Sequence, residues 1–298
     1  MPFEISTKNN LKDLKMMYLE ELVAKNFAYI YKERFMDAEV YVFDEKSIQT
    51  VFDASRYLVT VVRCIVLERN GENFNYKFLG SKECFTDFMK NGGVITILVY
   101  QGEAIAFNAS MLINSEDIST LVFGISMGNT KNKLNGKTMK ILGITYLSYF
   151  SRIAWQRTGR LYGTCMLNCP RTLHSLEPIF NKSCYPIRGI ESKYSKQIRT
   201  NIFNYYIKPN FSNAVLYNGF PIVETSKVEM GFKDSIEGMK IVGDSFYDSY
   251  FVSNLSDFSK QDIVITGDLF DGVISFWKLF LKLQLLKFEC FLAIKRRS

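Results

Sequence analysis

Residues 120–140 read TLVFGISMGNTKNKLNGKTMK, an apolar run followed by a glycine-punctuated, lysine-rich loop. The run TLVFGISM (120–127) is typical of a strand. From Lys137 the apolar residues recur with helical spacing, and Gly159 marks the expected end of a helix of about 20 residues. The stretch therefore predicts a strand, a loop and a helix, and it raises the question of which anion the loop binds.

The sequence on either side extends this unit into a sheet. VITILVYQ (94–101) and AIAFNASMLI (104–113) surround a tight glycine turn, which predicts a β-hairpin. EVYVFD (39–44) alternates like a strand, and Ser47 is expected to cap the helix that follows. Three further segments are expected: a short helix at 81–93, a strand at 161–167 and a short helix at 168–180. The order β, α, α, β, β, β, loop, α, β, α predicts an α/β (α+β) protein with a mixed sheet.

Both ends of the chain lie outside this order. Residues 1–36 are expected to form a helical lead-in, with apolar residues at roughly helical spacing from residue 8 onward, and residues 37–190 the main domain. Residues 191–298 are expected to form a C-terminal α/β extension that ends in an apolar-rich helix. Within it the patterns predict a helix at 192–207 and strands or extended segments at 215–226, 248–255 and 262–269.

Charge and composition narrow the class of partner. The 298 residues are 47% hydrophobic, and 37 Lys and Arg against 30 Asp and Glu give a net charge of +7. Such a surplus suits an anionic cofactor, an acidic partner or an anionic membrane surface. The basic residues are dispersed rather than arranged in a stripe, so nucleic acid is a less favoured ligand, and a basic nucleic-acid-binding protein remains an alternative.

The cysteines and the single histidine bear on metal binding and location. The six cysteines lie far apart, and Cys165, Cys169 and His174 lack the spacing of a zinc site, so no metal is expected and Cys165 should be a buried strand thiol. The opening MPFEISTKNN lacks a secretory signal pattern, which favours a cytoplasmic protein.

The loop does not follow the P-loop pattern. GxxxxGK[ST] requires glycine at position 131, where this chain has Lys131. Counting from Lys133, the residues KLNGKT resemble the Q/R-x-x-G-x-G/A loop of the GNAT superfamily of acyl-CoA-dependent acyltransferases, with lysine in the Gln/Arg place and Thr138 in the final small place. The order of elements over residues 37–187 also resembles GNAT, in which a hairpin and a fourth strand precede the loop. A solvated basic turn before an amphipathic helix is the alternative interpretation.

The resemblance implies a fold and a set of binding residues. It implies a mixed, mostly antiparallel sheet flanked by helices. It also implies that acetyl-CoA, a longer acyl-CoA or the phosphopantetheine of an acyl carrier protein binds at the loop, whose N–H groups and helix dipole suit pyrophosphate. Asn168 and the strand residues Ser126 and Met127 would contact the pantetheine arm. The loop residues implied are Lys131, Lys133, Asn135, Gly136, Lys137 and Thr138.

The acid and base of the implied reaction are not fixed by the resemblance. Where many GNAT relatives have a tyrosine as general acid, this chain offers Ser175, with His174 and Tyr185 nearby. The strand TLVFGISM lacks the usual carboxylate base, and Glu103, Glu116 or Asp117 is the nearest alternative. Direct transfer needs chiefly a positioned thioester and a stabilised oxyanion, so a missing base slows the reaction without abolishing it.

The last helix has two interpretations. Residues 273–294 are long enough to span a bilayer, but three lysines and Glu289 lie within them, so no span is expected. Such a helix most often packs on its own domain or on a homodimer mate. A peripheral membrane contact through 273–298, ending in KRRS, is the sharper alternative.

Taken together, the sequence predicts a GNAT-like N-acyltransferase. It would move an acetyl or longer acyl group from a pantetheine thioester to a primary amine of a small molecule, peptide or lipid. A non-catalytic GNAT-like module that binds CoA or a partner protein is the alternative from another class.

Overall fold

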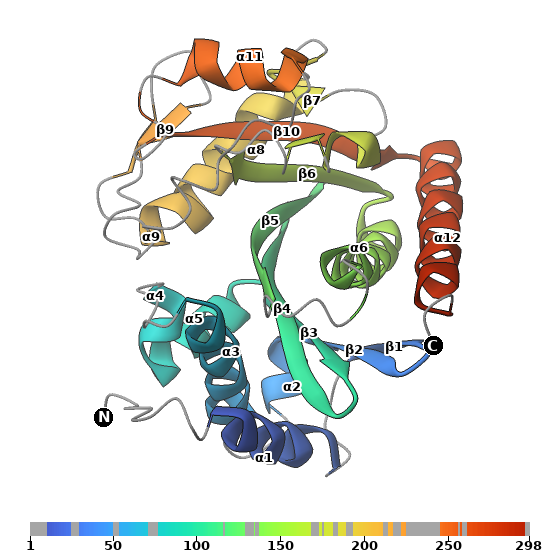
Figure 1. Cartoon of the computed structure of the whole chain (residues 1–298). Coiled ribbons are helices and arrows are strands. Elements are labelled where there is room, and N and C mark those ends of the chain that lie inside the picture. Colours follow the sequence, from blue (N-terminus) through green and yellow to red (C-terminus); the bar gives the residue numbers. More distant parts are fainter. Residues whose placement is uncertain are drawn as a thin grey trace. The chain divides into compact units, whose positions relative to one another are not determined.

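The fold is described from a computed structural model of the chain (Figure 1). It describes residues 11–24, 30–49, 54–70, 77–115, 117–128, 134, 137–167, 173–174, 176–180, 184–188, 193–210, 214–216, 222–224, 245–255, 257 and 261–295. The described helices and strands fall into two compact units. The first unit comprises Met1–Leu112, Gly124–Ile153 and Phe280–Ser298, and the second Ile113–Phe123 and Ala154–Leu279.

In the first unit the strand order is β1-β2-β3-β4-β5. The strands are β1 (Tyr31–Phe35), β2 (Ala38–Phe43), β3 (Gly93–Tyr100), β4 (Glu103–Asn114) and β5 (Ser119–Gly128), of which the ends of β4 and β5 reach into the second unit. β1 with β2, β2 with β3, and β3 with β4 are antiparallel. Gln101 and Gly102, both with positive φ, form the two-residue turn between β3 and β4, which is the backbone that a tight antiparallel hairpin requires.

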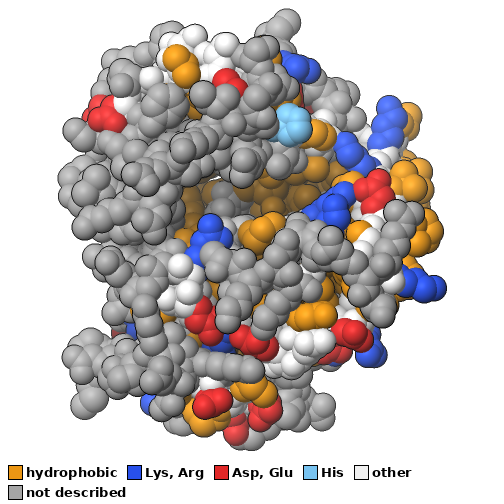
Figure 2. All heavy atoms as spheres, viewed as in Figure 1, with side chains coloured by type: hydrophobic (Ala, Val, Ile, Leu, Met, Phe, Trp, Pro, Cys, Tyr) orange, Lys and Arg blue, Asp and Glu red, His pale blue; other side chains and the backbone are white. Residues whose placement is uncertain are grey.

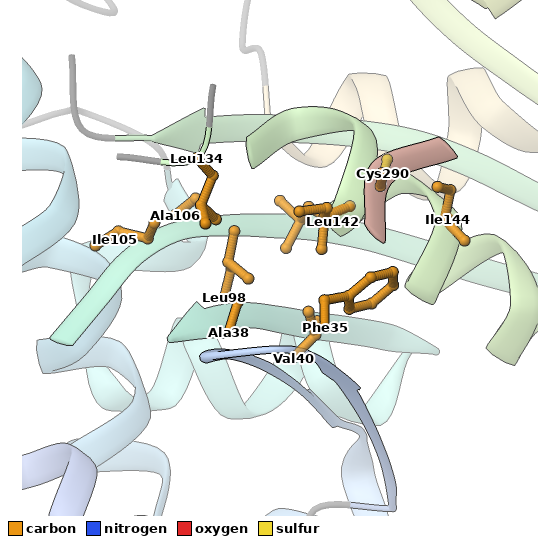
Figure 3. Packing of buried hydrophobic residues seen from close by; sticks show 11 residues of the cluster. Phe35, Ala38, Val40, Leu98, Ile105, Ala106, Leu134, Leu142, Ile144 and Cys290 are labelled. Atoms are coloured by element: carbon orange, nitrogen blue, oxygen red, sulfur yellow. The ribbon is translucent and has the colours of Figure 1, made fainter. Parts of the chain in front are cut away.

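Helices flank these strands. They are α1 (Leu11–Ala24), α2 (Glu45–Gln49), α3 (Ala54–Asn70), α4 (Lys77–Gly80), α5 (Lys82–Lys90), α6 (Thr138–Arg157) and most of α12 (Val273–Lys295). One apolar core joins α6 and α12 to the strands. Figure 3 shows Leu134 close to Ala106 of β4, and Cys290 of α12 beside Leu142 of α6.

In the second unit the strand order is β5-β6-β10-β9-β8, with β7 also paired to β10. The strands β6 (Arg160–Leu167) and β10 (Gln261–Asp271) are antiparallel, and β5 with β6 is parallel. The short strands are β7 (Cys184–Tyr185), β8 (Val215–Leu216) and β9 (Ile222–Glu224). The helices are α8 (Lys193–Ile202), continued by the π-helix Phe203–Ile207 and α9 (Lys208–Asn210), the 3₁₀ turn Glu177–Ile179, and α11 (Ser245–Asn254).

The expected fold class is confirmed. The sheet is mixed and mostly antiparallel, it is flanked by helices, and β3, β4, β5, α6 and β6 follow one another in the predicted order. Gly159 follows the end of α6 with φ of +68°, as a C-terminal glycine should. Where the final short helix was expected, the described residues have helical turns at 173–174 and 176–179. The domain boundaries at residues 36 and 190 stay predictions.

Three expectations were wrong. Residues 31–35 of the helical lead-in form β1, because YKERF alternates between exposed and buried positions and pairs with β2. Ser47 lies inside α2: Asp44 Oδ1 accepts from Ser47 N at 3.0 Å, and Ser47 Oγ accepts from Asp44 N at 3.1 Å, so Asp44 is the capping residue. Residues 248–254, expected to be extended, belong to α11, where Tyr247, Phe251 and Leu255 are buried at helical spacing.

Candidate functional site

The site begins where β5 stops pairing with β6. The register of the parallel pair runs from Ser119 with Leu161 to Phe123 with Cys165. Among the described residues, β5 continues to Gly128 with no further β6 partner. Its residues Gly124–Ser126 are partly or fully exposed, whereas the residues on either side of them are buried. Gly124 N donates to Ser110 Oγ at 3.5 Å, and Ile125 O accepts from Asn108 Nδ2 at 3.4 Å. We therefore expect a ligand to bind backbone groups on the edge of β5 that β6 has left.

Buried polar side chains lie beneath this part of β5. Asn108, on β4, is 1% exposed, and its Nδ2 donates to Ser126 Oγ at 2.8 Å. Ser110 Oγ donates to Asn108 Oδ1 at 2.7 Å. Thr96, opposite Asn108 on β3, has a buried hydroxyl for which no hydrogen-bond partner is found among the described atoms. Burying polar side chains in an apolar sheet costs free energy. Polar residues at Thr96, Asn108 and Ser110 therefore indicate that hydrogen bonding matters more than apolar packing at this position.

The end of β5 and the start of α6 approach each other closely. A Cβ added at Gly128 would lie 3.1 Å from Ala106 Cβ and 3.5 Å from Thr138 Cγ2. Lys137 N donates to Leu134 O at 2.8 Å, and Lys137 O accepts from Ile141 N at 2.8 Å, so Lys137 is the last residue before the helix. Helix geometry leaves the N–H groups of Thr138 and Met139 without an acceptor inside the helix, and these groups favour an anion.

Positive charge surrounds this helix start. Arg69, at the end of α3, donates from Nη1 to Gly128 O at 3.3 Å. Lys137 is half-buried beside the first turn of α6. Lys140 Nζ lies 2.7 Å from Glu289 of α12, and this ion pair lowers the pKa of Glu289. The first unit thus brings cations from α3 and α6 to the two ends of the loop.

The residues implied for donor binding fall partly on described positions. Ser126, Met127, Lys137 and Thr138 lie in one contiguous region of the first unit, at the end of β5 and the start of α6. The others lie outside the described residues: Lys131, Lys133, Asn135, Gly136 and Asn168.

Glu103 lies away from this region, at the hairpin turn between β3 and β4. Its Oε1 accepts from Lys15 Nζ at 3.1 Å, and the same ammonium binds Glu68 Oε2 at 2.6 Å and Ala104 O at 3.1 Å. Lys15 is fully buried. Glu103 is therefore part of an ion cluster that joins α1, α3 and the hairpin.

His174 and Tyr185 both belong to the second unit. His174 is exposed, as Figure 2 shows for the single histidine, and its ring lies edge-on to Tyr247 at 5.3 Å. Tyr185, on β7, pairs with Thr266, which pairs with Thr164 and, through it, with Val122 of β5. Three inter-strand spacings, about 14 Å, therefore separate Tyr185 from β5. Ser175 lies outside the described residues.

The described cysteines are buried or half-buried free thiols. Cys165 is a buried strand thiol, as predicted, and burial raises its pKa well above the ordinary value. Burial also raises the pKa of Cys184 to about 12. Within the part of the chain that the structure describes, no group of three or more His, Cys, Asp or Glu side chains is arranged to hold a metal ion.

Sequence reasoning missed Arg69, Asn108 and Ser110. The two β4 residues did leave a signal, because Asn108 and Ser110 are polar at alternate positions of an otherwise apolar strand and so share a face. Arg69 left none, since its place depends on where α3 ends relative to β5.

Comparison with known proteins gave structural similarity only. No protein-family model matches the chain, and no curated protein matches it. Solved structures similar to it include a possible acetyltransferase from Clostridium difficile 630, with 10% identity, covering 52% of this chain and 97% of that one at a TM-score of 0.33. A second is a GNAT family acetyltransferase from Elizabethkingia anophelis with acetyl-CoA bound. It is 12% identical, and the match covers 65% of this chain and 88% of that one at a TM-score of 0.30.

A third similar structure is an aminoglycoside 6'-N-acetyltransferase from Enterococcus faecium. It is 9% identical, and the match covers 78% of this chain and 98% of that one at a TM-score of 0.32. The strand order and register of the chain itself define its mixed, mostly antiparallel sheet.

Proposed function

We propose that this chain is a GNAT-like N-acyltransferase, which moves an acyl group from the pantetheine thioester of an acyl-CoA to a primary amine. One observation carries the proposal. β5 stops pairing with β6 at Phe123, continues to Gly128 through the partly or fully exposed residues Gly124–Ser126, and leads into a glycine-lysine loop and the start of α6. A strand edge that no longer pairs with its neighbour, next to a helix N-terminus, suits a ligand that has amides at one end and a pyrophosphate at the other.

The pyrophosphate end would bind at the loop and the first turn of α6. Lys131, Lys133, Asn135 and Gly136 would supply backbone N–H groups and charge, together with Lys137 and Thr138. Arg69 holds the carbonyl oxygen of Gly128 at the entrance to this loop and adds a further cation. The close packing around Gly128 supports the proposal, because it fixes the end of β5 against the helix start.

The thioester end would lie along Gly124–Met127. Backbone groups of β5 would hydrogen-bond the pantetheine amides, with Asn168 as a further contact. The hydrogen bond from Asn108 to Ser126 fixes the strand at this point. A positioned thioester is the main requirement of direct transfer, because orientation alone supplies a large part of the rate.

In the transfer step the amine nitrogen attacks the thioester carbonyl carbon, and the carbonyl oxygen becomes an oxyanion. Backbone N–H groups of β5 are suited to stabilise that oxyanion. The intermediate then expels the thiolate, which takes up a proton, while the amine loses one. His174, Ser175 and Tyr185 stay candidates for the acid, and Asp117 and Glu116 for the base. Glu103 is the weakest base candidate, since Lys15 engages its carboxylate.

The donor would carry an acetyl or a longer acyl group, and an acyl carrier protein would present the same phosphopantetheine. The acceptor would be a small molecule, a peptide or a lipid with a primary amine. The net charge of +7 favours anionic donors of either kind.

A non-catalytic module that binds CoA is the second candidate. It is favoured by the position of one base candidate and one acid candidate, each within its own unit. Glu103 is held in an ion cluster, and Tyr185 lies three strands away from β5. Such a module would bind the donor without turning it over.

Calorimetric titration with acetyl-CoA and with a long-chain acyl-CoA tests the proposal. Lys137→Glu reverses a charge at the start of α6, and we expect it to weaken donor binding at least about tenfold, because a carboxylate there repels phosphate. Gly136→Glu should act similarly. Lys90→Glu, at an exposed position of α5, reverses the same charge away from the site and should leave binding unchanged.

The outcomes separate the candidates. Binding that Lys137→Glu weakens, together with release of free CoA when amines are added, supports the transferase. The same binding without CoA release for any amine tested supports the non-catalytic module. No binding of either donor contradicts both.

A further inference from the structure

The helix α12 has two apolar faces, and in the part of the chain that the structure describes only one of them is buried. Ser275, Leu279, Leu283 and Cys290 are buried, and Cys290 belongs to the core of the first unit. A helix that is apolar all round is normally covered all round. The second face, which the described residues leave exposed, is therefore available to a partner.

The exposed face is a continuous stripe along the helix. Ile274 is 75% exposed and Leu285 65% exposed. We call the exposed large apolar residues of this helix the α12 apolar stripe: Val273, Ile274, Trp277, Phe280, Leu281, Leu285, Phe288, Phe291 and Leu292. They recur at intervals of three and four, so they share one side of the helix. These nine side chains are each roughly half exposed. Their combined exposed apolar area is larger than the largest apolar patch of a typical monomer, which is about 300–600 Å².

The stripe is bordered by positive charge. Lys278 and Lys282 lie on one edge, and Lys287 lies on the other, where it binds Glu33 at 3.1 Å. The one acid of the helix, Glu289, is bound by Lys140. Residues 273–298 hold six basic residues and one acidic residue, a net charge of +5 out of +7 for the whole chain. Figure 2 shows hydrophobic side chains among Lys and Arg along the edge where α12 lies in Figure 1.

This charge distribution decides between two occupants. If the stripe packed against a second copy of itself, two lysine-bordered edges would meet, and like charges would oppose the contact. In an anionic bilayer the headgroups carry the charge opposite to that of the lysines. The acyl region beneath the headgroups is apolar, as the stripe requires. Trp277 lies within the stripe, and tryptophan is common on the apolar face of helices that lie in the plane of a membrane surface. None of the described helices is long and apolar enough to cross a membrane.

We propose that the α12 apolar stripe inserts in the plane of an anionic lipid surface, with the lysines of α12 and the basic tail at the headgroups. The helix lies on the membrane and does not span it. The proposal does not depend on the acyltransferase activity, because it rests on α12 alone.

Flotation of the 298-residue chain with lipid vesicles tests the proposal. Vesicles of phosphatidylcholine alone are compared with vesicles containing about a third phosphatidylglycerol. We expect at least about fivefold more protein to float with the anionic vesicles, and high salt to reduce the difference. Leu285→Glu should lower binding to them at least about tenfold, because it puts a charge into the acyl layer. Lys278→Glu should reduce binding to anionic vesicles only.

Val252→Glu is the matched control. Val252 is 67% exposed on α11, so the variant places the same charge on an apolar surface position outside the stripe, and its flotation should equal that of the parent chain. Circular dichroism melting should show that both glutamate variants fold. Equal binding of the parent chain to neutral and anionic vesicles contradicts the proposal. So does a parent chain that floats with neither and sediments as a dimer that Leu285→Glu dissociates, which would make a second copy the occupant.

Discussion

At the scale of single residues, Gly124 fixes how closely β5 can approach β4. A Cβ added there would lie 1.8 Å from the carbonyl oxygen of Ala109, a backbone atom that cannot move without disturbing the sheet. We expect Gly124→Ala to lower the free energy of unfolding by about 2–4 kcal/mol. Gly143→Ala is the matched change, because its Cβ would meet nothing nearer than 4.0 Å on α6. It should raise stability by about 0.5–1 kcal/mol. Urea denaturation measures both, and equal effects would contradict the close approach.

The ion cluster of Lys15 gives a second prediction at this scale. Lys15→Met removes the cation that Glu68 and Glu103 share and leaves two carboxylates in a largely buried place. We expect a loss of about 3–5 kcal/mol. Glu103→Gln should lower the free energy of unfolding by less. The loss in the double variant should be smaller than the sum of the two single losses, because both substitutions act on one cluster. Catalytic rates of folded Glu103→Gln should match the parent chain. A large fall in kcat with unchanged stability would instead indicate that Glu103 acts as the general base.

At the scale of elements, the predictable parts of the chain are those whose signal is local. The glycine turn of β3 and β4, the run of β5 and the terminal glycine of α6 each lie within a few residues, and each was read correctly. β1 was missed because an alternation over only five residues is too short to predict a strand by itself. Pairing with β2 stabilises it, and that pairing is not visible in the segment's own sequence. α11 was missed because its aromatic and β-branched residues favour strands, and tertiary packing of Phe251 overrides that preference.

The site follows the same rule. The start of α6 after the loop could be predicted, because the helical spacing of its apolar residues lies within the segment itself. Phosphate binding at the loop stays a prediction. The residue at which β5 leaves β6 could not be predicted, because it depends on the register of two strands separated by α6. The contact of Arg69 with Gly128 depends likewise on the end of a distant helix.

The two faces of α12 give a prediction for this element. Leu283 is 2% exposed and Leu285 is 65% exposed, two residues apart on one helix. We expect Leu283→Ala to lower the free energy of unfolding by about 2–4 kcal/mol, through lost burial and a cavity, whereas Leu285→Ala should change it by less than about 0.5 kcal/mol. Both substitutions make the same change in helix propensity, so each controls for the other. Urea denaturation without lipid measures them, and similar losses would mean that the stripe is already covered in solution.

At the scale of the whole molecule, β5 belongs to both units. Its first residues, to Phe123, pair within the second unit, and the rest lies in the first. α12 likewise begins in the second unit and ends in the first. Because two continuous elements are shared, unfolding of one unit would remove part of a strand and part of a helix from the other. The chain should therefore unfold as one cooperative system.

Calorimetry with the donor tests this expectation together with the site. We expect a single unfolding transition, and acetyl-CoA at about a hundred times its Kd should stabilise the native chain by about 2.7 kcal/mol. For a chain of this size that corresponds to a rise in Tm of about 3–8 °C, and the whole transition should shift because a ligand on the first unit stabilises the shared elements too. Lys137→Glu should lose the shift at the same donor concentration, and Lys90→Glu should keep it. Two transitions, of which only one responds to acetyl-CoA, would show that the units unfold independently despite the shared strand and helix, and would leave the donor site assigned to the responding unit alone.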